Sequence, residues 1–570
     1  MKLDLIFAPQ HDPGFPHSAL PHLKGFLMRE LPEIEVKCHD LNHLFYKSVI
    51  GSDYNLVLND FRHNVDKSNS IEECISNVLD FEKFTQSKFD LWSLKHDGFR
   101  LTLRSLDAPH SRTKIEEIIK FSENVTPFDS LFGKYLQESD ADVFGINLSV
   151  EDQILPSFRL VFLIRELKPK AKIIWGGALL SRVFPVFGNS LKHYFDFIII
   201  REGEMPLASL LKYLLGKNKF PKNDDKIKAA EDIKNCSVVR DFEKDTTQVT
   251  DISITGGQIF EDYDVDNYWN LTKMLPLLSS RKCYWGKCKF CTIHESWDPK
   301  KRILDYKVVL REISNLVNEY SIRDFRFVDE ASPPNLLKDL SKGILEARLD
   351  INFEIYGIAE KRFLNQSFVS QLGLSGCVQS YFGLESIDKD LIKQMGKKIN
   401  QSDSISQIFK NCAESGIHVY SYALFGYPGA TEKANKATTK FIINELNLHT
   451  ATIGSFVPVI GSPFALENKN SLVHENGFTE DFSVFIDENQ MSYSGRELGN
   501  KEAKKALREV LESRPDLALT TLFNDESRYY LSKKFGANFA QKVDVSKLNT
   551  LRGEHSIIDF AIRQRIDRGH

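Results

Sequence analysis

The sequence predicts an α/β protein with two consecutive parallel-sheet regions and a mainly helical C-terminal extension over residues 471–570. Strand-like and helix-like segments alternate over residues 1–217 and again over residues 271–470. The polar segment 218–270, which contains KNKFPKNDDKIKAAED, is expected to be a linker or crossing segment between them. Such alternation is typical of parallel sheets with right-handed crossovers.

The first region begins with the strand-like segment LDLIFAP and continues with SALPHLKGFLMREL, whose apolar residues have helical spacing. VKCHDLN is the second expected strand, and ADVFGINLS at 141–149 is the third. The helix LPSFRLVFLIREL and the strands KIIWGGALL and FDFIII follow, and then REGEMPLASLLKYLLG. We expect a doubly wound, Rossmann-like sheet with helices inserted at about 45–135.

The second region contains six strand-like segments separated by helical stretches. They are LPLL (275–278), DFRFV (324–328), NFEIYGI (352–358), VQSYF (378–382), HVYSYALF (418–425) and TIGSFVPV (452–459). Six such units predict a (β/α)6 partial TIM barrel, whose chemistry lies at the C-terminal ends of the strands. The extension, with segments such as NKEAKKALREVLES, is charged and expected to be mostly helical.

Composition excludes several classes of protein. The net charge of -4 and pI of about 6.5 argue against a general nucleic-acid binder. No apolar run approaches the roughly 20 residues that span a bilayer, so no membrane partner is expected. The N-terminal apolar stretch is too short for a signal peptide and is interpreted as a first strand. Eight cysteines in 570 residues do not make a disulfide scaffold, which favours a reducing, cytoplasmic location.

Three of the eight cysteines fall within nine residues, in Cys283-Tyr-Trp-Gly-Lys-Cys288-Lys-Phe-Cys291. An iron–sulfur cube normally takes four cysteines, so three would leave one iron open to a substrate or cofactor. The alternative is a structural zinc site with His294 as the fourth ligand. Spacing alone leaves both open. The remaining cysteines are expected to be small buried hydrophobes: Cys38, Cys74, Cys236, Cys377 and Cys412.

The segment SSRKCYWGKCKFC resembles the cluster loop of radical S-adenosylmethionine (radical SAM) enzymes, and it follows the first barrel strand as theirs does. The commonest spacing in that family is C-x3-C-x2-C, whereas this chain has C-x4-C-x2-C. The resemblance implies a [4Fe–4S] cluster held by Cys283, Cys288 and Cys291, with S-adenosylmethionine on the open iron.

Three later segments match family positions, so that the resemblance covers about 270–470. FVDEASPP (327–334) resembles the acidic segment near the methionine amino group, which implies that Asp329 and Glu330 accept hydrogen bonds from it. The alternative for this pair is a solvated helix N-cap. FGLES (382–386) resembles the segment beside the ribose, which implies roles for Glu385 and Ser386.

The third segment, FGYPGATE (425–432), resembles the motif on the fifth strand that packs near the adenine. Gly426 and Gly429 would allow close approach of the backbone there.

The first region resembles the cobalamin-binding domain fused to many members of this family, through PHSALPHLKGFL, FGINLS, IIWGGALLS and IIIREGEMP. The resemblance places Ser149, Gly176 and Gly177 near the corrin or its nucleotide tail. Glu202, Gly203 and Glu204 also match a family segment, without an assigned role. Some cobalamin domains carry Asp-x-His-x-x-Gly, but the equivalent loop here is QHDPG (10–14), and His11 is interpreted as an ordinary loop histidine.

The resemblance implies cleavage of S-adenosylmethionine to a 5′-deoxyadenosyl radical and cobalamin-dependent methylation of an unactivated carbon. The substrate would be a small molecule or a peptide, and a reductase, flavodoxin or ferredoxin would donate electrons. The cofactors carry the difficult chemistry, so no catalytic side chain is predicted. Two alternatives remain. One is a non-methylating radical SAM enzyme (cyclisation, rearrangement or bond cleavage) with a vestigial cobalamin domain, and the other is a zinc-stabilised, non-catalytic binding module.

Overall fold

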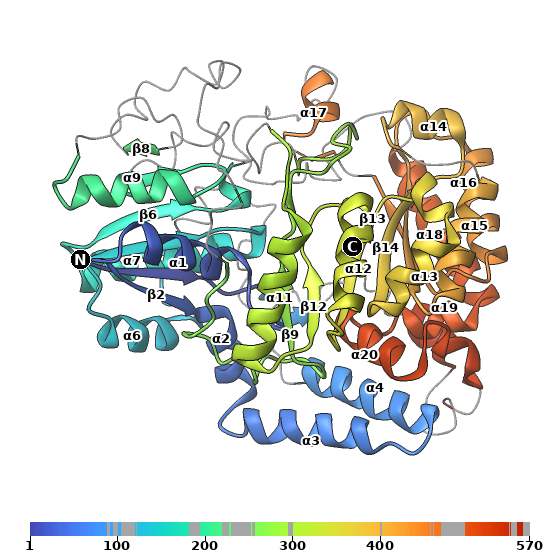
Figure 1. Cartoon of the computed structure of the whole chain (residues 1–570), viewed down its shortest axis with the longest axis horizontal. Coiled ribbons are helices and arrows are strands. Elements are labelled where there is room, and N and C mark those ends of the chain that lie inside the picture. The colour runs from blue at the N-terminus through green and yellow to red at the C-terminus, as the bar shows by residue number, and fades with distance from the viewer. Residues whose placement is uncertain are drawn as a thin grey trace.

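The computed structural model describes residues 1–87, 92–94, 101–103, 120, 122–181, 194–218, 227–229, 252, 257–293, 300–398, 402–456, 458–459, 461–468, 496–545, 548 and 556–562. Two six-stranded sheets lie side by side in this part of the chain (Figure 1). No helix within it is long and apolar enough to cross a membrane.

The first sheet has the strand order β2-β1-β5-β6-β7-β8. Its strands are β1 (Lys2–Phe7), β2 (Glu35–Asp40), β5 (Val143–Asn147), β6 (Lys172–Gly176), β7 (Phe197–Ile199) and β8 (Ile227–Ala229). The first five are parallel, whereas β8 pairs antiparallel with β7. The chain therefore moves to one side of β1 and then to the other, so that the strand order reverses between β1 and β5. The expected doubly wound sheet is confirmed.

Helices cover both faces of this sheet, which explains why its central strand β5 is buried along its whole length. On one face, α1 (Ala19–Glu30) and α9 (Glu204–Leu214) pack on Leu3, Leu5 and Phe7 of β1. On the other face, α2 (Leu41–Ile50), α6 (Asp129–Glu138) and α7 (Ile154–Leu167) form a second apolar core.

The insertion between β2 and β5 is helical in large part, as expected. It contains α3 (Tyr54–Lys67) and α4 (Ile71–Ser87), which run below the second sheet in Figure 1. It also contains the short antiparallel pair β3 (Trp92–Leu94) and β4 (Leu101–Leu103), which helical spacing does not predict. Most of 104–121 lies outside the described residues.

The segment expected as a linker is packed where it is described. Trp269 is fully buried in the core that α4 shares, and its indole N–H donates to Thr85 Oγ1 at 2.9 Å. Lys24 of α1 pairs with Glu261 at 2.6 Å and with Asp262. Strand β8 also falls within 218–270. The described part of this segment therefore belongs to the folded core and is not simply a linker.

The second sheet has the order β16-β15-β14-β13-β12-β9, and every pairing is parallel. Its strands correspond to the six expected segments: β9 (Met274–Leu277), β12 (Asp324–Phe327), β13 (Asn352–Gly357), β14 (Cys377–Glu385), β15 (His418–Phe425) and β16 (Thr450–Ser455). Six α-helices lie between them in the described part of the sequence: α11 (Tyr306–Tyr320), α12 (Pro334–Glu346), α13 (Gln366–Leu374), α14 (Lys389–Gln394), α15 (Ser402–Glu414) and α16 (Glu432–Asn444). The sheet is open between β9 and β16, as expected for a partial barrel.

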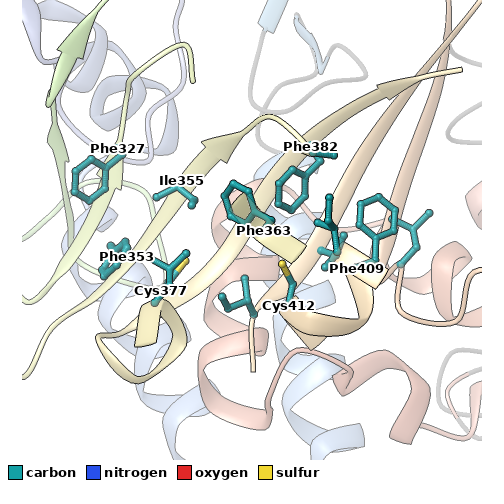
Figure 2. Close-up of a cluster of buried hydrophobic side chains, with 14 of the residues drawn as sticks. Phe327, Phe353, Ile355, Phe363, Cys377, Phe382, Phe409 and Cys412 are labelled. Atoms are coloured by element: carbon teal, nitrogen blue, oxygen red, sulfur yellow. The ribbon is translucent and has the colours of Figure 1, made fainter. Parts of the chain in front are cut away.

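One face of the barrel strands forms an apolar core with the outer helices. Figure 2 shows Phe327, Phe353 and Phe382 from the strands and Phe409, which lies near Phe382, and all four are at most 1% exposed. Cys377 and Cys412 lie in the same core at 3% and 0% exposure. Cys38 and Cys74 are buried elsewhere, so the described members of this group behave as apolar side chains, and Cys236 lies outside the described residues.

The opposite face of the strands carries charge. Arg326 of β12 pairs with Glu354 of β13 and, at 2.7 Å, with Glu526. Gln379 and Tyr381 of β14 both donate to Glu354, at 2.9 and 3.2 Å. Arg326, Glu354 and Glu526 are 5%, 0% and 2% exposed, so one cation serves two carboxyl groups away from water. Burial raises the pKa of Glu354 to about 7 and that of Glu526 to about 8, although Arg326 opposes both shifts.

Glu526 belongs to the C-terminal extension, which is helical where it is described. Its helices are α18 (Arg496–Ser513), α19 (Pro515–Thr520), α20 (Asp525–Phe535) and α22 (Ile557–Ile562). Helix α18 packs on β16, the last strand of the open barrel. Helix α20 covers the N-terminal ends of the strands, where Tyr529 Oη donates to Asp324 at 2.9 Å.

Glu82 joins α4 to α20, and its raised pKa predicts how the free energy of unfolding depends on pH. It is 8% exposed and accepts from Ser527 Oγ at 2.8 Å. Burial raises the pKa of Glu82 from 4.5 to about 7, although hydrogen bonds from Ser527 and Asn524 oppose the shift. The folded state therefore binds this proton more tightly than the unfolded state. Its contribution to stability is present below pH 4.5 and is lost as pH rises through about 7.

In the wild type, the Glu82 proton makes the free energy of unfolding fall as pH rises from 5 to 7. We expect Glu82→Gln to reduce this slope by about 1 kcal/mol per pH unit. Urea unfolding at several pH values would measure the slope. Glu72→Gln, on the same helix, is the control and should keep the wild-type slope. Equal slopes for the wild type and Glu82→Gln would contradict the assignment.

Candidate functional site

The cysteine loop begins directly after β9, at the C-terminal end of the barrel. Strand β10 (Ser280–Arg281) pairs antiparallel with β11 (Arg302–Ile303), so the two ends of the loop meet. Asp329, just beyond β12, fixes the first end. It accepts from the backbone N–H groups of Ser279 and Ser280, each at 2.8 Å, and from Ser279 Oγ at 2.5 Å.

These contacts give Asp329 a role in addition to the one that the resemblance implies. Its carboxylate is 1% exposed and also accepts from Ser332 Oγ at 3.2 Å, so it holds the loop, and its contact with the methionine amino group stays a prediction. It is not an N-cap either, because the N-cap of α12 is Pro333. Glu330 is half-buried and close enough to Cys291 to raise the pKa of that thiol. Of the two carboxylates, Glu330 is therefore the one beside the cysteines.

The three thiols of the loop are half-buried, free and close enough to influence one another electrostatically. Burial raises the pKa of Cys288 to about 12 and also raises the pKa of Cys291, so both are protonated thiols unless a metal displaces the proton. No three His, Cys, Asp or Glu side chains among the described residues are grouped to hold a single metal ion, and His294 lies outside those residues. A four-iron cube held by these three cysteines, with one open iron, stays a prediction.

The aromatic pair Tyr284 and Trp285 lies within the longer C-x4-C spacing, and Trp285 is held by a neighbouring segment. Trp285 Nε1 donates to the carbonyl of Gly396 at 2.8 Å, and the ammonium groups of Lys287 and Lys398 lie 5.1 and 5.7 Å from its ring. The backbone N–H of Lys289 donates to the carbonyl of Met395 at 2.9 Å. The segment 395–398, which follows α14 (Lys389–Gln394), therefore holds the loop along its length.

Lys397 places a positive charge beside the cysteines, and sequence motifs do not identify it. Its ammonium donates to Glu385 Oε1 at 2.7 Å and lies 5.7 Å from the ring of Phe290. Burial by itself lowers the pKa of Lys397, but Glu385 and the thiols of Cys288 and Cys291 outweigh it and raise the pKa. Glu385, predicted beside the ribose, lies at a bulge of β14 with a φ of 56° and is turned toward this lysine.

The remaining predicted contacts to S-adenosylmethionine lie around the same end of the barrel. Ser386 is 2% exposed; its Oγ accepts from the backbone N–H of Asp388 at 3.1 Å and lies 3.2 Å from Thr438 Oγ1, so it stabilises the start of α14. Gly426 and Gly429 both have positive φ, at 77° and 92°. A Cβ at Gly429 would lie 2.3 Å from Gln394 Oε1, so this glycine permits a close approach within the protein itself.

The predicted cobalamin residues lie where the strand order of the first sheet reverses. Ser149, after β5, contacts His17 from the β1–α1 loop, with 3.3 Å between Oγ and Nε2. His17 Nδ1 accepts from the backbone N–H of Ala19 at 3.3 Å, which leaves Nε2 as the donor to Ser149. Burial lowers the pKa of His17 to about 4, so the ring is neutral. In doubly wound sheets, ligands bind at this position.

Gly176 and Gly177, at the end of β6, differ in whether the surrounding protein leaves space for a side chain. Gly177 has a φ of 120°, and a Cβ there would lie 2.3 Å from the carbonyl oxygen of Leu148. Contact with the protein's own backbone, rather than contact with a ligand, therefore requires glycine at position 177. A Cβ at Gly176 would lie 3.6 Å from the carbonyl oxygen of Ile199, which is an ordinary van der Waals contact, so the surrounding protein would tolerate a side chain there. Residues 182–193, which follow this loop, lie outside the described residues.

The comparisons with known proteins decide the family of the barrel. The model of the Radical SAM superfamily matches residues 277–442. Residues 277–442 are a radical SAM domain. The match contains β12, β13, β14 and β15, begins at the last residue of β9 and includes the cysteine loop, in agreement with the expected resemblance.

Curated relatives of this chain carry names of methyltransferases. Bacteriochlorophyllide d C-12(1)-methyltransferase of Chlorobaculum tepidum is 26% identical over 209 residues, which are 36% of this chain and 44% of that protein. Cytidylyl-2-hydroxyethylphosphonate methyltransferase of Streptomyces wedmorensis is 22% identical over 369 residues, which are 59% of this chain and 68% of that protein. The chain thus spans less than half of the first relative and about two thirds of the second.

Two solved structures share the fold of both sheets. The radical S-adenosylmethionine methyltransferase TsrM from Kitasatospora setae, solved with cobalamin and a [4Fe–4S] cluster, has a TM-score of 0.54 at 13% identity, over 89% of this chain and 88% of that chain. The cobalamin-dependent radical enzyme OxsB, solved with aqua-cobalamin, has a TM-score of 0.59 at 13% identity, over 99% and 80%. The fold class expected from sequence is therefore confirmed.

A buried ionic network joins the radical SAM domain to the first sheet. Glu202, which follows β7, and Glu204, the first residue of α9, face Arg281 and Arg302 at the two ends of the cysteine loop. Arg281 binds Glu202 at 2.8 Å and also Glu204, while Arg302 binds both oxygens of Glu202. The REGE segment, whose role the sequence leaves open, is thus a contact with the cysteine loop.

Proposed function

We propose that this chain is a cobalamin-dependent radical SAM methyltransferase acting on an unactivated carbon of a small-molecule or peptide substrate. Cys283, Cys288 and Cys291 would hold the [4Fe–4S] cluster, and the reversal point of the first sheet would hold cobalamin. The observation that carries the proposal is the cysteine loop of a radical SAM domain docked, through both of its ends, onto a doubly wound sheet. The methyltransferase names of the relatives support the same reaction.

The bound cofactors supply the radical and the methyl group, and the protein's own residues position them. Asp329 and the segment 395–398 hold the cysteine loop in place. Glu330 and the Lys397–Glu385 pair put charged groups beside the cysteines, where the amino and carboxylate groups of S-adenosylmethionine need partners of opposite sign. His17 and Ser149 present a neutral, hydrogen-bonded surface to the corrin site. A reductase, flavodoxin or ferredoxin would supply electrons.

Anaerobic reconstitution tests the proposal. The purified protein would be supplied with iron and sulfide, then with hydroxocobalamin, desalted, and examined by absorption and metal analysis. We expect about four irons per chain together with retained corrin bands. Iron without corrin would overturn cobalamin-dependent methylation and favour a non-methylating radical enzyme. Zinc without iron would overturn the radical chemistry altogether.

A further inference from the structure

We propose that Glu202, Glu204, Arg281 and Arg302 form a clamp that sets the position of the cysteine loop relative to the corrin site. They are positioning residues, since they act through the loop and the sheet edge that they join. This inference rests on the proposed two-cofactor function. It adds to that function the element that fixes the position of the two cofactor sites relative to each other.

The first argument is the placement of the four side chains. Arg281 lies two residues before Cys283, and Arg302 is its direct partner in the β10–β11 pair, so together they close the loop. Both bind Glu202, which follows β7 of the other sheet. One carboxylate therefore ties the beginning and the end of the cysteine loop to the first sheet, and Glu204 adds a second tie to Arg281.

The second argument is burial. The side chains of Glu202, Glu204, Arg281 and Arg302 are 0%, 5%, 4% and 9% exposed. Burial by itself raises the pKa of Glu204, but Arg281 outweighs it and holds the pKa below its ordinary value. A buried ion pair has few alternative partners, so it favours one arrangement of the surfaces that it joins more strongly than an exposed pair does.

The third argument is the backbone on each side of the clamp. Arg201 and Lys282 directly flank Glu202 and Arg281, and their φ values are 60° and 69°. Non-glycine residues adopt such values only where the surroundings compensate the cost. Each side of the clamp therefore sits on a specifically shaped turn, as expected of a contact with one defined geometry.

The chemistry explains why such a contact matters. A methyl group can be transferred only to a carbon held within reach, and a displacement of about 1 Å can slow a reaction by about 10²-fold. The radical would be generated at the cysteine loop and the methyl group delivered from the first sheet. A clamp that joins these two elements fixes the separation on which transfer depends.

The test measures that separation directly and needs no substrate. The full-length holoenzyme, reconstituted with cluster and hydroxocobalamin, would be reduced so that the cluster and cob(II)alamin are both paramagnetic. Pulsed electron paramagnetic resonance then gives the distance distribution between the two spins. The variants are Glu202→Gln, Arg281→Lys and Arg302→Lys. Arg302→Lys is the mildest of the three, because Arg302 binds Glu202, whereas Arg281 binds both Glu202 and Glu204. The control is Arg159→Lys, which alters a buried ion pair with Asp129 inside the first domain.

We expect one narrow distance in the wild type and in Arg159→Lys. The three clamp variants should give broader distributions with displaced maxima while retaining iron and corrin bands. Unchanged distributions in clamp variants that hold both cofactors would overturn the positioning role alone. A wild-type protein that retains iron but no corrin would overturn the proposed function and, with it, this inference. The absorption spectrum distinguishes these two results.

Discussion

Replacing Cys283, Cys288 and Cys291 together by Ala is expected to remove the iron and to abolish cleavage of S-adenosylmethionine. The three thiols share one loop and lie within electrostatic range of one another, and no other described side chains are grouped to take over a metal. Without the cluster there is no electron source at the sulfonium, so the loss should be complete. Formation of 5′-deoxyadenosine under anaerobic, reducing conditions measures it.

A matched variant separates loss of the cluster from loss of the fold. Cys377→Ala removes a thiol from the barrel core, 3% exposed and away from the loop, and should retain iron. The triple variant should keep the circular dichroism spectrum and the hydroxocobalamin binding of the wild type, because the first sheet has its own apolar cores. Cleavage of S-adenosylmethionine by the triple variant would refute the assignment of the cluster.

The second large effect concerns stability. Arg326→Met is expected to lower the free energy of unfolding by about 3–5 kcal/mol, because it leaves the carboxylates of Glu354 and Glu526 buried without their cation. Loss of the guanidinium also removes its stacking on Phe15, whose ring lies 4.8 Å away. Denaturant unfolding of the reconstituted protein measures the difference.

A combined variant tests whether unpaired charge is the cause. Adding Glu354→Gln and Glu526→Gln to Arg326→Met removes both carboxylates and should recover a large part of the lost stability. The double variant Glu354→Gln and Glu526→Gln alone would leave Arg326 without an anion and should also be destabilised. If the triple variant is no more stable than Arg326→Met, loss of packing rather than of charge pairing explains the effect.

Much of the fold follows from hydrophobic pattern. The six barrel segments are short apolar runs bounded by helical spacing, and each forms a parallel strand. The pattern fails where tertiary packing decides the structure. Trp269 gives an apolar signal within a polar stretch, and only its burial against α4 shows that the stretch is part of the core. Likewise, β8 is a three-residue strand whose pairing with β7 has no local signature.

In the site, too, local features could be predicted from the sequence, whereas features set by tertiary packing could not. The expected ligand types and their order follow from the cysteine loop, because spacing along one loop is a local property. The partners of Asp329 and Ser386 could not, since both side chains are engaged by backbone groups whose position depends on the fold. Lys397 and Arg281 were missed for a related reason. Lys397 lies near the thiols of Cys288 and Cys291, which are distant in sequence, and Arg281 binds carboxylates that follow a strand of the other sheet. A single basic residue gives no pattern in the sequence.

The contact between α4 and α20 has a consequence for biosynthesis. Glu82 and Ser527 are 445 residues apart in the sequence, and α20 also covers the N-terminal ends of the barrel strands. A nascent chain can complete its first five parallel strands while the ribosome is still translating the barrel. The base of the barrel, by contrast, stays uncovered until almost the whole polypeptide has emerged. The surface of α4 that later receives α20 is thus exposed throughout most of translation, and this is the interval in which a chaperone would protect the unfinished protein.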